Sequence, residues 1–348
     1  MTRRVLAAAC AATAVAAVVP SVAGAKTFNT FAGGDDVVKS APKGFSPNAF
    51  LRNTMIVHVG DSVRWRFRGF HTVTFPVKGK KPPAFILPGA QLVAGAVDGA
   101  GRPFWFNGKL PTLAPNPVAA GPAKGSNYDG TKLRNSGLPA TPPKSYSLKF
   151  TKTGTFSYYC VVHPGMKGTV RVVSSRSRIP TDAQNQTAAT RELNRLAAVA
   201  KIAAARPVAA GTVNVGRAPA GQRFTINAFF PSKATAKVGQ TVKFTMAGQN
   251  ATEVHTATLG PLTRDQVPFI GATGVNPIAA YPSDPPPTLP PYTGQNHGNG
   301  FLNTGLLDND PASTTISNTG AVTFNSAGTF QLKCLVHPGM DATVTVTP

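Results

Sequence analysis

Two copies of one octapeptide hold the residues of this sequence that are best suited to chemistry. YCVVHPGM, residues 159–166, recurs as KCLVHPGM at residues 333–340, and each copy has a cysteine, a histidine three residues later and a methionine three residues after that. Another histidine lies upstream of each copy, in FHTVTF (70–75) and VHTATL (254–259). Thiolate, imidazole and thioether are the soft and borderline ligands that suit copper. The candidate metal ligands are His71, Cys160, His163 and Met166 in the first set, and His255, Cys334, His337 and Met340 in the second.

The ligand types also indicate the kind of copper site. An ion that alternates between Cu(I) and Cu(II) needs a site that is acceptable to both states, and a thiolate with two imidazoles and a weak axial methionine is such a site. The Pro-Gly pair of HPGM favours a turn that directs His and Met to the same point. Each set therefore predicts a type 1 (blue) copper site, so that the chain would use copper, Cu(I)/Cu(II), as its cofactor at two sites.

Other uses of these residues are weaker explanations. A single histidine or cysteine in a β protein is more often packed than ligating, but eight matching residues in two copies reverse that expectation. A disulfide between Cys160 and Cys334 would leave both histidine loops without a purpose. His58 has no counterpart in the second copy, which favours a half-buried structural role, and His297 in GQNHGNG is interpreted as a polar loop residue.

The octapeptide ends a longer repeat. VGDSVRWRF (59–67) matches VGQTVKFTM (238–246), PTLAP (111–115) matches PTLPP (287–291), and LKFTKTGTFSYYC (148–160) matches VTFNSAGTFQLKC (322–334). A spacing of about 180 residues between such blocks indicates a duplicated domain. The predicted units are a signal peptide (1–25), a first domain (26–178), a linker (179–210) and a second domain (211–348).

Secondary structure follows from the residue patterns. Val, Thr, Phe and Tyr alternate with polar residues between glycines and prolines, which is typical of short half-buried strands, and we expect an antiparallel β-sandwich in each copy. The stretches 76–144 and 260–320 are rich in Pro, Gly and Asn, and are expected to be ordered insertions with few regular strands. Residues 181–206 predict a helix, with Thr181 or Asp182 as its cap and an apolar side formed by Leu193, Leu196, Ala200 and Ala203.

The motif VGDSVRWRF, the strand GTFSYYC and the Cys-x-x-His-x-x-Met loop resemble the cupredoxin family, which includes plastocyanin and amicyanin. The resemblance covers 45–175 and 222–348 apart from the insertions. It implies an all-β fold of two cupredoxin-like Greek-key β-sandwiches with long loop insertions, joined by a helical linker, and it implies electron transfer. Thr72 and Thr256 follow the upstream histidines where plastocyanin and amicyanin have an Asn that steadies the loop and bonds to the cysteine sulfur, so a threonine hydroxyl would take over that role.

The N-terminus predicts export. Arg3 and Arg4 precede an apolar run from Leu6 to Val19, and Ala23-Gly24-Ala25 provides a small-residue cleavage site. No second apolar run approaches the length of about 20 residues that spans a bilayer. We therefore expect a mature chain without a transmembrane segment, located in the periplasm, the cell envelope or the extracellular space.

Charge is concentrated in the first half of the chain. The formal net charge is +22; residues 26–180 hold 22 Lys and Arg against 5 Asp and Glu, whereas residues 211–348 hold 7 against 6. Arg64, Arg66 and Arg68 alternate along one predicted strand, so they share a face, and Lys78, Lys80 and Lys81 follow. The expected partner is an acidic redox protein that docks on the first domain, with an anionic cell envelope as another possibility. Nucleic acid is not expected, because the chain lacks a basic helix or an aromatic stacking platform.

Two other functions compete with an electron carrier. Multicopper oxidases and copper nitrite reductases also use cupredoxin repeats, but their additional copper needs a histidine beside the cysteine or a His-x-His pair. Tyr159 and Lys333 precede the cysteines here and no His-x-His occurs, so we predict no enzyme and no catalytic residues. The remaining alternative is a protein that stores or delivers copper without redox traffic.

Overall fold

The computed structural model describes residues 24–35, 38–139, 145–250, 253–263, 265–271, 274–310 and 316–348. The predicted signal peptide lies outside the described residues, apart from Gly24 and Ala25. Among the helices that are described, none has the length and apolar character needed to cross a bilayer.

Two five-stranded sheets in the first half of the chain enclose an aromatic core. Trp65 lies at its centre, with ring centroids 5.4 Å from Phe75 and 5.2 Å from Tyr158 on the opposite sheet. Alternation in SVRWRFR buries Val63 and Trp65 and leaves Arg64 and Arg66 exposed. The strand order in the first sheet is β3 (Phe50–Leu51), β1 (Thr27–Gly33), β5 (Ser62–Arg68), β11 (Ser145–Phe150), β9 (Asn127–Tyr128). The strand order in the second sheet is β10 (Arg134–Asn135), β6 (Thr74–Phe75), β12 (Gly154–Tyr159), β13 (Lys167–Val173), β4 (Thr54–His58).

The second half forms a similar pair of sheets, and a short two-stranded pair lies beside them. Val242, Phe244 and Phe324 are buried in their shared core. The all-β, two-domain fold class is therefore confirmed. The orders are β2 (Phe45–Ser46), β15 (Thr225–Phe230), β14 (Thr212–Arg217), β17 (Thr241–Thr245), β24 (Thr319–Thr323); β16 (Lys233–Lys237), β26 (Asp341–Thr347), β25 (Gly328–Lys333), β19 (Thr258–Leu259), β22 (Leu302–Asn303); and β18 (Val254–His255) with β23 (Leu307–Asp308).

The expectation of purely antiparallel sheets is wrong. β1 pairs in parallel with β5 and β13 with β4, and in the second half β14 pairs in parallel with β17 and β16 with β26. Consecutive strands here change sheets: β4 belongs to the opposite sheet from β1 and β5. A chain that crosses to the other sheet and returns can lay its next strand parallel to the first, because the crossover supplies the connection that a tight hairpin cannot.

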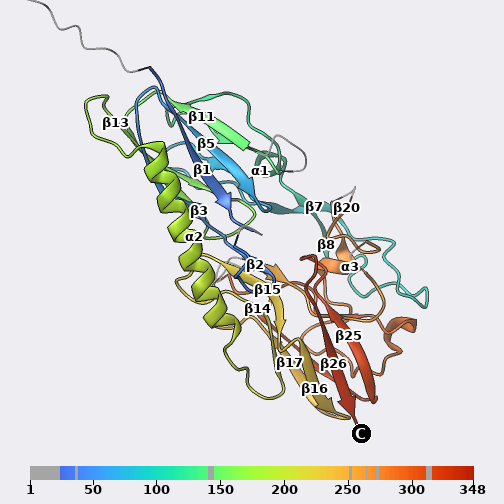
Figure 1. Ribbon diagram of the computed structural model, residues 1–348. Coiled ribbons are helices and arrows are strands. Elements are labelled where there is room, and N and C mark those ends of the chain that lie inside the picture. Colours follow the sequence, from blue (N-terminus) through green and yellow to red (C-terminus); the bar gives the residue numbers. More distant parts are fainter. Residues whose placement is uncertain are drawn as a thin grey trace, which may run out of the picture.

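The predicted helix is confirmed as α2 (Asp182–Ala204). Its first turn has a capping box, in which Thr181 and Gln184 satisfy each other's backbone N–H groups. Leu193, Leu196 and Ala200 are buried and pack in one cluster with residues of both halves. Burying a leucine side chain stabilises a fold by about 1.5–3 kcal/mol, so this helix holds the two sandwiches together along one side (Figure 1).

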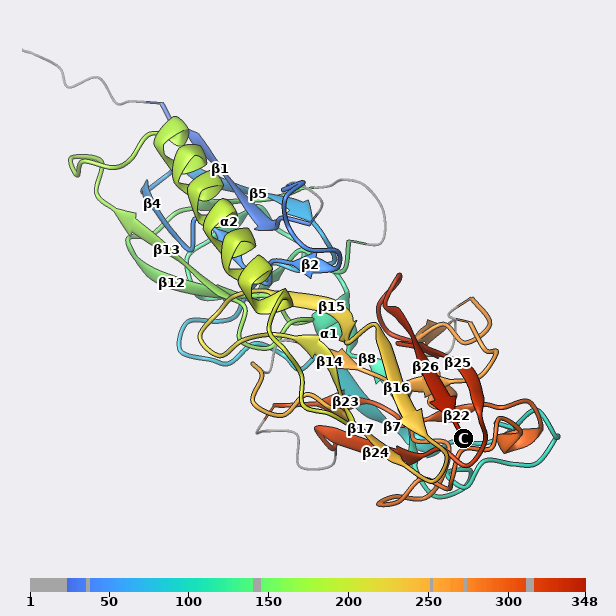
Figure 2. The same ribbon diagram turned by 60° about the horizontal axis from the view of Figure 1, so that its bottom comes forward.

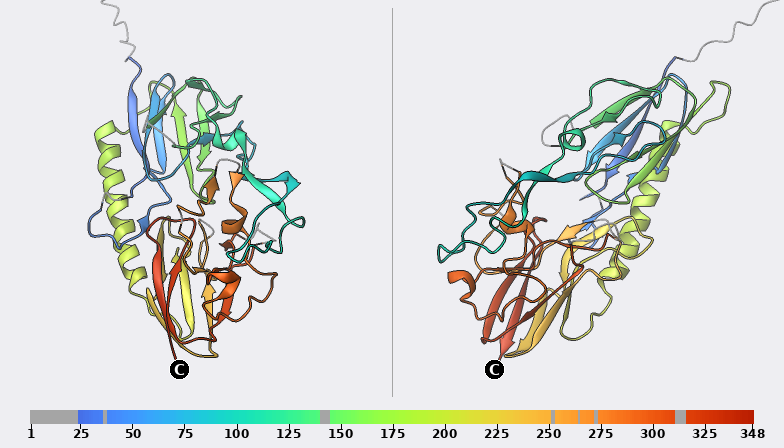
Figure 3. Two further views of the ribbon diagram at one scale, coloured as in Figure 1. Left: turned by 90° about the vertical axis from the view of Figure 1, so that its right-hand side faces the viewer. Right: turned by 180° about the vertical axis from the view of Figure 1, so that it is seen from behind.

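The two insertions contain more regular structure than expected and join each other. β7 (Ile86–Leu92) and β8 (Pro111–Pro115) of the first form one sheet with β20 (Ile270–Gly271) and β21 (Gly274–Val275) of the second. The other insertion elements are α1 (Pro117–Ala120), α3 (Pro277–Ala280) and the 3-10 turn η1 (Asn296–Gly298). Together they run along the molecule on the side opposite α2 (Figure 3, left).

A match proposed between the insertions is also corrected. PTLAP is strand β8, whereas PTLPP at 287–291 lies in no strand. The structural counterpart of the segment after β8 is NPIAA at 276–280, because NPVAA and NPIAA form the short helices α1 and α3 with an Asn at each N-cap. Buried Asn135 and Asn303, in NSGL and NTGL, donate to carbonyl groups of α1 and α3 respectively.

The halves therefore share more than a linker. β2 comes from the first half but pairs with β15 of the second, with Thr225 opposite Ser46. Figure 2 shows the two sandwiches end to end, with α2 lying across both. The sites described next lie where the sandwiches meet.

Candidate metal centres

The first predicted ligand set converges. His71 lies between β5 and β6, Cys160 directly follows β12, and His163 lies in the turn before β13. Nδ1 of His163 is 3.3 Å from Sγ of Cys160 and 3.0 Å from Nδ1 of His71, while Nδ1 of His71 is 4.0 Å from the sulfur. All three side chains are buried.

The second set repeats this arrangement. His255 ends β18, Cys334 directly follows β25 and His337 lies in the turn before β26. Sγ of Cys334 is 3.8 Å from Nδ1 of His255 and 3.9 Å from Nδ1 of His337. In both sites the three ligand atoms lie within 4.8 Å of one another. The structure thus brings the two histidines and the cysteine of each set together, and their role as metal ligands stays a prediction.

The separations fit a single metal ion. Bonds of the lengths that zinc makes, about 2.0 Å to imidazole nitrogen and about 2.3 Å to thiolate sulfur, spread by about 110–120°, place the donor atoms about 3.3–3.7 Å apart. The observed 3.0–4.0 Å brackets that range. One soft sulfur and two imidazoles are also the donor chemistry of a trigonal copper site. The residues present therefore fit copper.

Each upstream imidazole has its second nitrogen against a glycine. Nε2 of His71 and Nε2 of His255 are buried and have no hydrogen-bond partner among the described residues. A Cβ added at Gly33 would lie 2.3 Å from Nε2 of His71, and one added at Gly216 would lie 2.5 Å from Nε2 of His255. Both glycines have positive φ, of 79° and 77°. These equivalent positions, which the sequence analysis missed, make room for the imidazoles and fix their orientation through packing.

Threonine takes the place of the expected asparagine in both sites. Thr72 donates its backbone N–H to Sγ of Cys160 at 3.3 Å, and its hydroxyl accepts the backbone N–H of Val161 at 2.9 Å. Thr256 donates in the same way to Cys334 at 3.4 Å, and its hydroxyl accepts from Leu335 at 2.8 Å. A hydrogen bond to the sulfur and a tie between two loops are thus both present.

The methionines lie at the end of the ligand loops. Met166 and Met340 are 2% and 0% exposed. The backbone carbonyl of Met166 accepts from the N–H of Cys160 at 3.0 Å, and that of Met340 accepts from Cys334 at 3.0 Å. Gly165 and Gly339, with φ of 80° and 75°, allow the turn. These bonds close each loop next to its cysteine; axial ligation by the thioethers stays a prediction.

A buried carboxylate that the sequence analysis missed lies between the sites. Glu253 is 7% exposed; its Oε1 lies 3.2 Å from Nε2 of His163, and its Oε2 lies 3.2 Å from Nε2 of His337. Asn48 donates to Oε1 at 3.1 Å. A signal was available: Glu253 is one of only two glutamates in the chain and stands two residues before a ligand histidine, where the first copy has Gly69.

The electrostatics of the sites favour metal binding. Burial alone would raise the pKa of the Cys160 thiol, but the imidazoles of His163 and His71 lower that pKa well below its usual value, and Cys334 is lowered in the same way by His255 and His337. Burial would lower the pKa of His337, yet Glu253 and Cys334 raise it to about 9. Because metal ligands must be deprotonated, a metal cation that binds at such a site releases protons.

Two other histidines are explained by their contacts. His58 is half-buried, as predicted, and its Nε2 lies 2.8 Å from the carbonyl oxygen of Ser177. His297 is not an ordinary loop residue: its Nδ1 lies 3.3 Å from Oδ2 of Asp98 and its Nε2 lies 3.0 Å from Oδ2 of Asp284. Because Asp98 belongs to the first insertion, this histidine helps to join the two.

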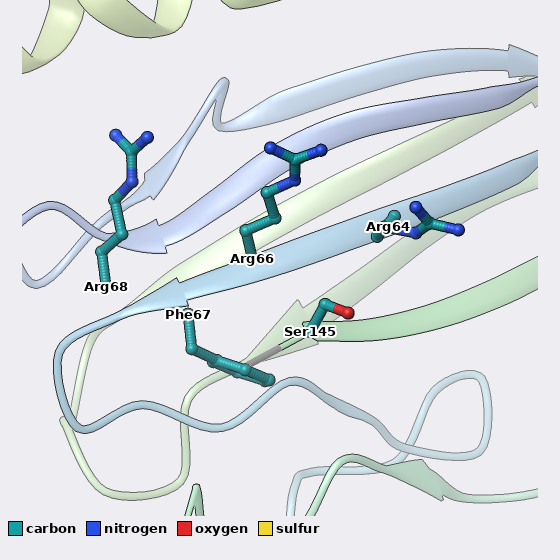
Figure 4. Close-up of a pocket in the computed structure, with 5 residues that line it drawn as sticks. All are labelled: Arg64, Arg66, Phe67, Arg68 and Ser145. Carbon is teal, nitrogen blue, oxygen red and sulfur yellow. The ribbon is translucent and has the colours of Figure 1, made fainter. Parts of the chain in front are cut away.

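The predicted arginine face exists on β5. Arg64 and Arg66 are exposed, Arg68 is half-buried, and all three project from the same side of the strand, away from Phe67 (Figure 4). They line an open surface hollow of about 430 Å³ with Phe67 and Ser145. The Arg68 guanidinium lies 3.7 Å from the centre of the Phe31 ring, which holds it in place. Lys78, Lys80 and Lys81 are also exposed.

Comparisons with known proteins give structural matches alone. No family model matches the sequence, and no curated protein matches it. An oxidised amicyanin variant is 19% identical to this chain. The match covers 42% of this chain and 81% of the amicyanin chain, and its TM-score is 0.20. Auracyanin B is 22% identical, covers 41% of this chain and 91% of its own, and has a TM-score of 0.25. Both are cupredoxins, the family that the motifs resemble.

Proposed function

We propose that the protein is an exported copper protein that transfers single electrons, with one type 1 site in each half. The observation that supports this proposal is the convergence of Sγ and two Nδ1 atoms, twice, at separations that suit one ion. Copper bound there would supply a one-electron couple. The proposed ligands are the eight residues of the two predicted sets.

The chain contributes a fixed ligand frame. The Thr72 and Thr256 amides hold the cysteine sulfurs, and glycines pack against the upstream imidazoles, so the ligands are held in place by contacts other than the metal. A site that keeps its geometry in both oxidation states loses little free energy to reorganisation when an electron arrives. Hydrogen bonds to the sulfur and its burial also tune the reduction potential.

Export and the choice of partner are further parts of the proposal. The N-terminal pattern supports a secretory signal and a location in the periplasm, the cell envelope or outside the cell. The arginine face of β5 supports docking of an acidic redox protein by charge complementarity. Docking of this kind should weaken as salt is added, because the Debye length falls to about 8 Å at physiological ionic strength.

A store or delivery protein is the alternative that the same ligands allow. Burial of both cysteines, at 4% and 0% exposure, argues against it, because handing over an ion by ligand exchange needs an accessible sulfur. Rapid reversible voltammetry supports a carrier. Tight Cu(I) retention with sluggish electron exchange would instead support a store.

The test is copper loading of the mature protein. We expect about two coppers per chain by metal analysis and an intense visible thiolate-to-copper absorption band in the oxidised protein. Cys160→Ala and Cys334→Ala should each remove about half of that band. Full copper content without the band would overturn the proposed type 1 sites, and turnover of a phenol or of nitrite by the protein alone would indicate an enzyme.

A further inference from the structure

Glu253 makes contact with both candidate sites through one imidazole of each. Oε1 and Oε2 each lie 3.2 Å from an Nε2, of His163 in the first half and of His337 in the second. The opposite ring atoms, the two Nδ1, face the cysteine sulfurs of their own sites at 3.3 and 3.9 Å. Nδ1 is therefore the atom placed to bind metal, and Glu253 accepts a hydrogen bond from the Nε2–H of each ring.

The Glu253 carboxylate, which bridges the two sites, is buried and accepts a third hydrogen bond. Glu253 is 7% exposed and Asn48, which is 1% exposed, donates to its Oε1. Asn48 and His163 come from the first half of the chain, whereas Glu253 and His337 come from the second. Hydrogen bonds in such a dry environment respond strongly to one another's charge distribution. One carboxylate thus connects two sites across the junction between the sandwiches.

We propose that Glu253 couples the two metal sites, so that filling or oxidising one of them changes the metal affinity and the reduction potential of the other. This inference rests on the proposed function. A carboxylate that accepts from a ligand imidazole makes that ligand a better donor to the metal. A cation bound at Nδ1 of His163 strengthens its Nε2–H as a donor and draws charge towards Oε1, which leaves Oε2 a weaker acceptor for His337. The expected coupling is therefore negative.

The coupling is measured by copper titration. The product of the two stepwise association constants of the intact protein is divided by the product of the constants of the one-site variants Cys160→Ala and Cys334→Ala. Independent sites give a ratio of one. We expect a ratio about fivefold or more below one, within the usual range of couplings between sites.

Two substitutions separate the bridge from its charge. Glu253→Gln keeps the shape, but its amide NH₂ cannot accept a hydrogen bond; Glu253→Asp keeps the charge but is too short to reach both imidazoles. Glu192→Gln is the matched control, because this half-buried glutamate pairs with Arg223 and not with a candidate ligand histidine. Repulsion between two ions at a fixed separation is the same in every variant, so the part of the coupling that is lost on substitution belongs to Glu253.

The outcomes are distinct. The ratio should move towards one in both Glu253 variants and stay at the wild-type value in Glu192→Gln. The reduction potentials of the two sites should follow the same pattern across the variants. Glu253→Gln should raise both potentials, because a nearby negative charge favours Cu(II), and Glu192→Gln should leave both unchanged. Two blue coppers that bind independently in the wild type, or an unchanged ratio in a folded Glu253 variant, would overturn the coupling and leave the proposed function intact. Absence of copper binding would overturn both.

A second measurement needs no change at Glu253, in case its variants fail to fold. In the Cu(I)-loaded protein, the Nε2–H proton of His163 should give a slowly exchanging NMR resonance. Cys334→Ala empties the other site and should shift that resonance through the bridge. A resonance that does not move would contradict the coupling.

Discussion

Thr72 is bonded to Cys160 and to the residue after it at the same time: its N–H donates to the sulfur at 3.3 Å, and its hydroxyl accepts from Val161 at 2.9 Å. Thr256 has the same relation to Cys334 and Leu335. In each half, the loop that holds the upstream histidine is thereby fastened to the strand that delivers the cysteine.

Thr72→Val separates these two bonds. Valine keeps the size and the backbone donor to sulfur, but it removes the acceptor for the Val161 N–H and a longer contact, 3.8 Å, from the hydroxyl to the sulfur. An unsatisfied buried donor costs about 1–3 kcal/mol. We expect the free energy of unfolding to fall by that amount, with the copper band retained. Denaturant unfolding measures the loss, and Thr235→Val, on an exposed strand position, is the control. Equal losses in the two variants would show that the hydroxyl is not needed.

Gly33→Ala should disable the first site alone, and Gly216→Ala the second alone. At Gly33 the added Cβ would lie 2.1 Å from the backbone oxygen of Arg68 and 2.3 Å from Nε2 of His71, and at Gly216 it would lie 2.5 Å from Nε2 of His255. The ring must therefore leave its position in the site. Gly221→Ala is the matched control, because it has a similar positive φ of 74° and open space around it. Copper content and the visible band should fall by about half in each site variant and stay unchanged in the control. Full copper content in Gly33→Ala would contradict this role.

Met166→Leu tests axial ligation. Leucine fills the buried space but donates nothing, and a weaker axial donor stabilises Cu(II) less than a thioether does. We therefore expect copper to stay bound and the reduction potential of the first site to rise, by spectroelectrochemistry. Met340→Leu should do the same to the second site. An unchanged potential in both variants would mean that neither methionine is a ligand.

His297 should make the junction of the insertions depend on pH. Hydrogen bonds that His297 donates to the carboxylates of Asp284 and Asp98 raise its pKa against the effect of its burial, while Arg102 pairs with Asp98 from the other side. A folded pKa above the unfolded value of about 6.5 means that the stabilisation is complete below about pH 6.5 and is lost as pH rises through the folded value. The difference in free energy of unfolding between wild type and His297→Gln should be about 1 kcal/mol at pH 5, given partial screening by solvent. Chemical unfolding from pH 5 to pH 9 should show it shrinking, and a difference that grows with pH would reverse the sign.

The ligand positions could be predicted because their information is local and repeated. Cys160, His163 and Met166 lie in one octapeptide, and a short loop leaves few ways to arrange them. The same holds for α2, whose capping residues and apolar side are contiguous in the sequence. His71 and His255 are distant from their cysteines, and it was the second copy that singled them out.

The remaining features depend on how distant segments meet. Neither the parallel pairing of β1 with β5 nor the antiparallel pairing of β2 with β15 of the other half leaves a periodic mark in the sequence. The same is true of the sheet that the insertions share. Glu253 belongs to this class, because its role requires His163 and His337 to face each other across the junction.

The pairing of β2 with β15 has a consequence for how the two halves of the chain depend on each other. Phe45 and Ser46 are encoded with the first half yet complete a sheet of the second, so the second half depends on the first for this edge strand. If a gene rearrangement separated the two halves at the linker, β15 would lose its partner β2 and would have an open edge. An engineered second half therefore has to keep this segment of the first.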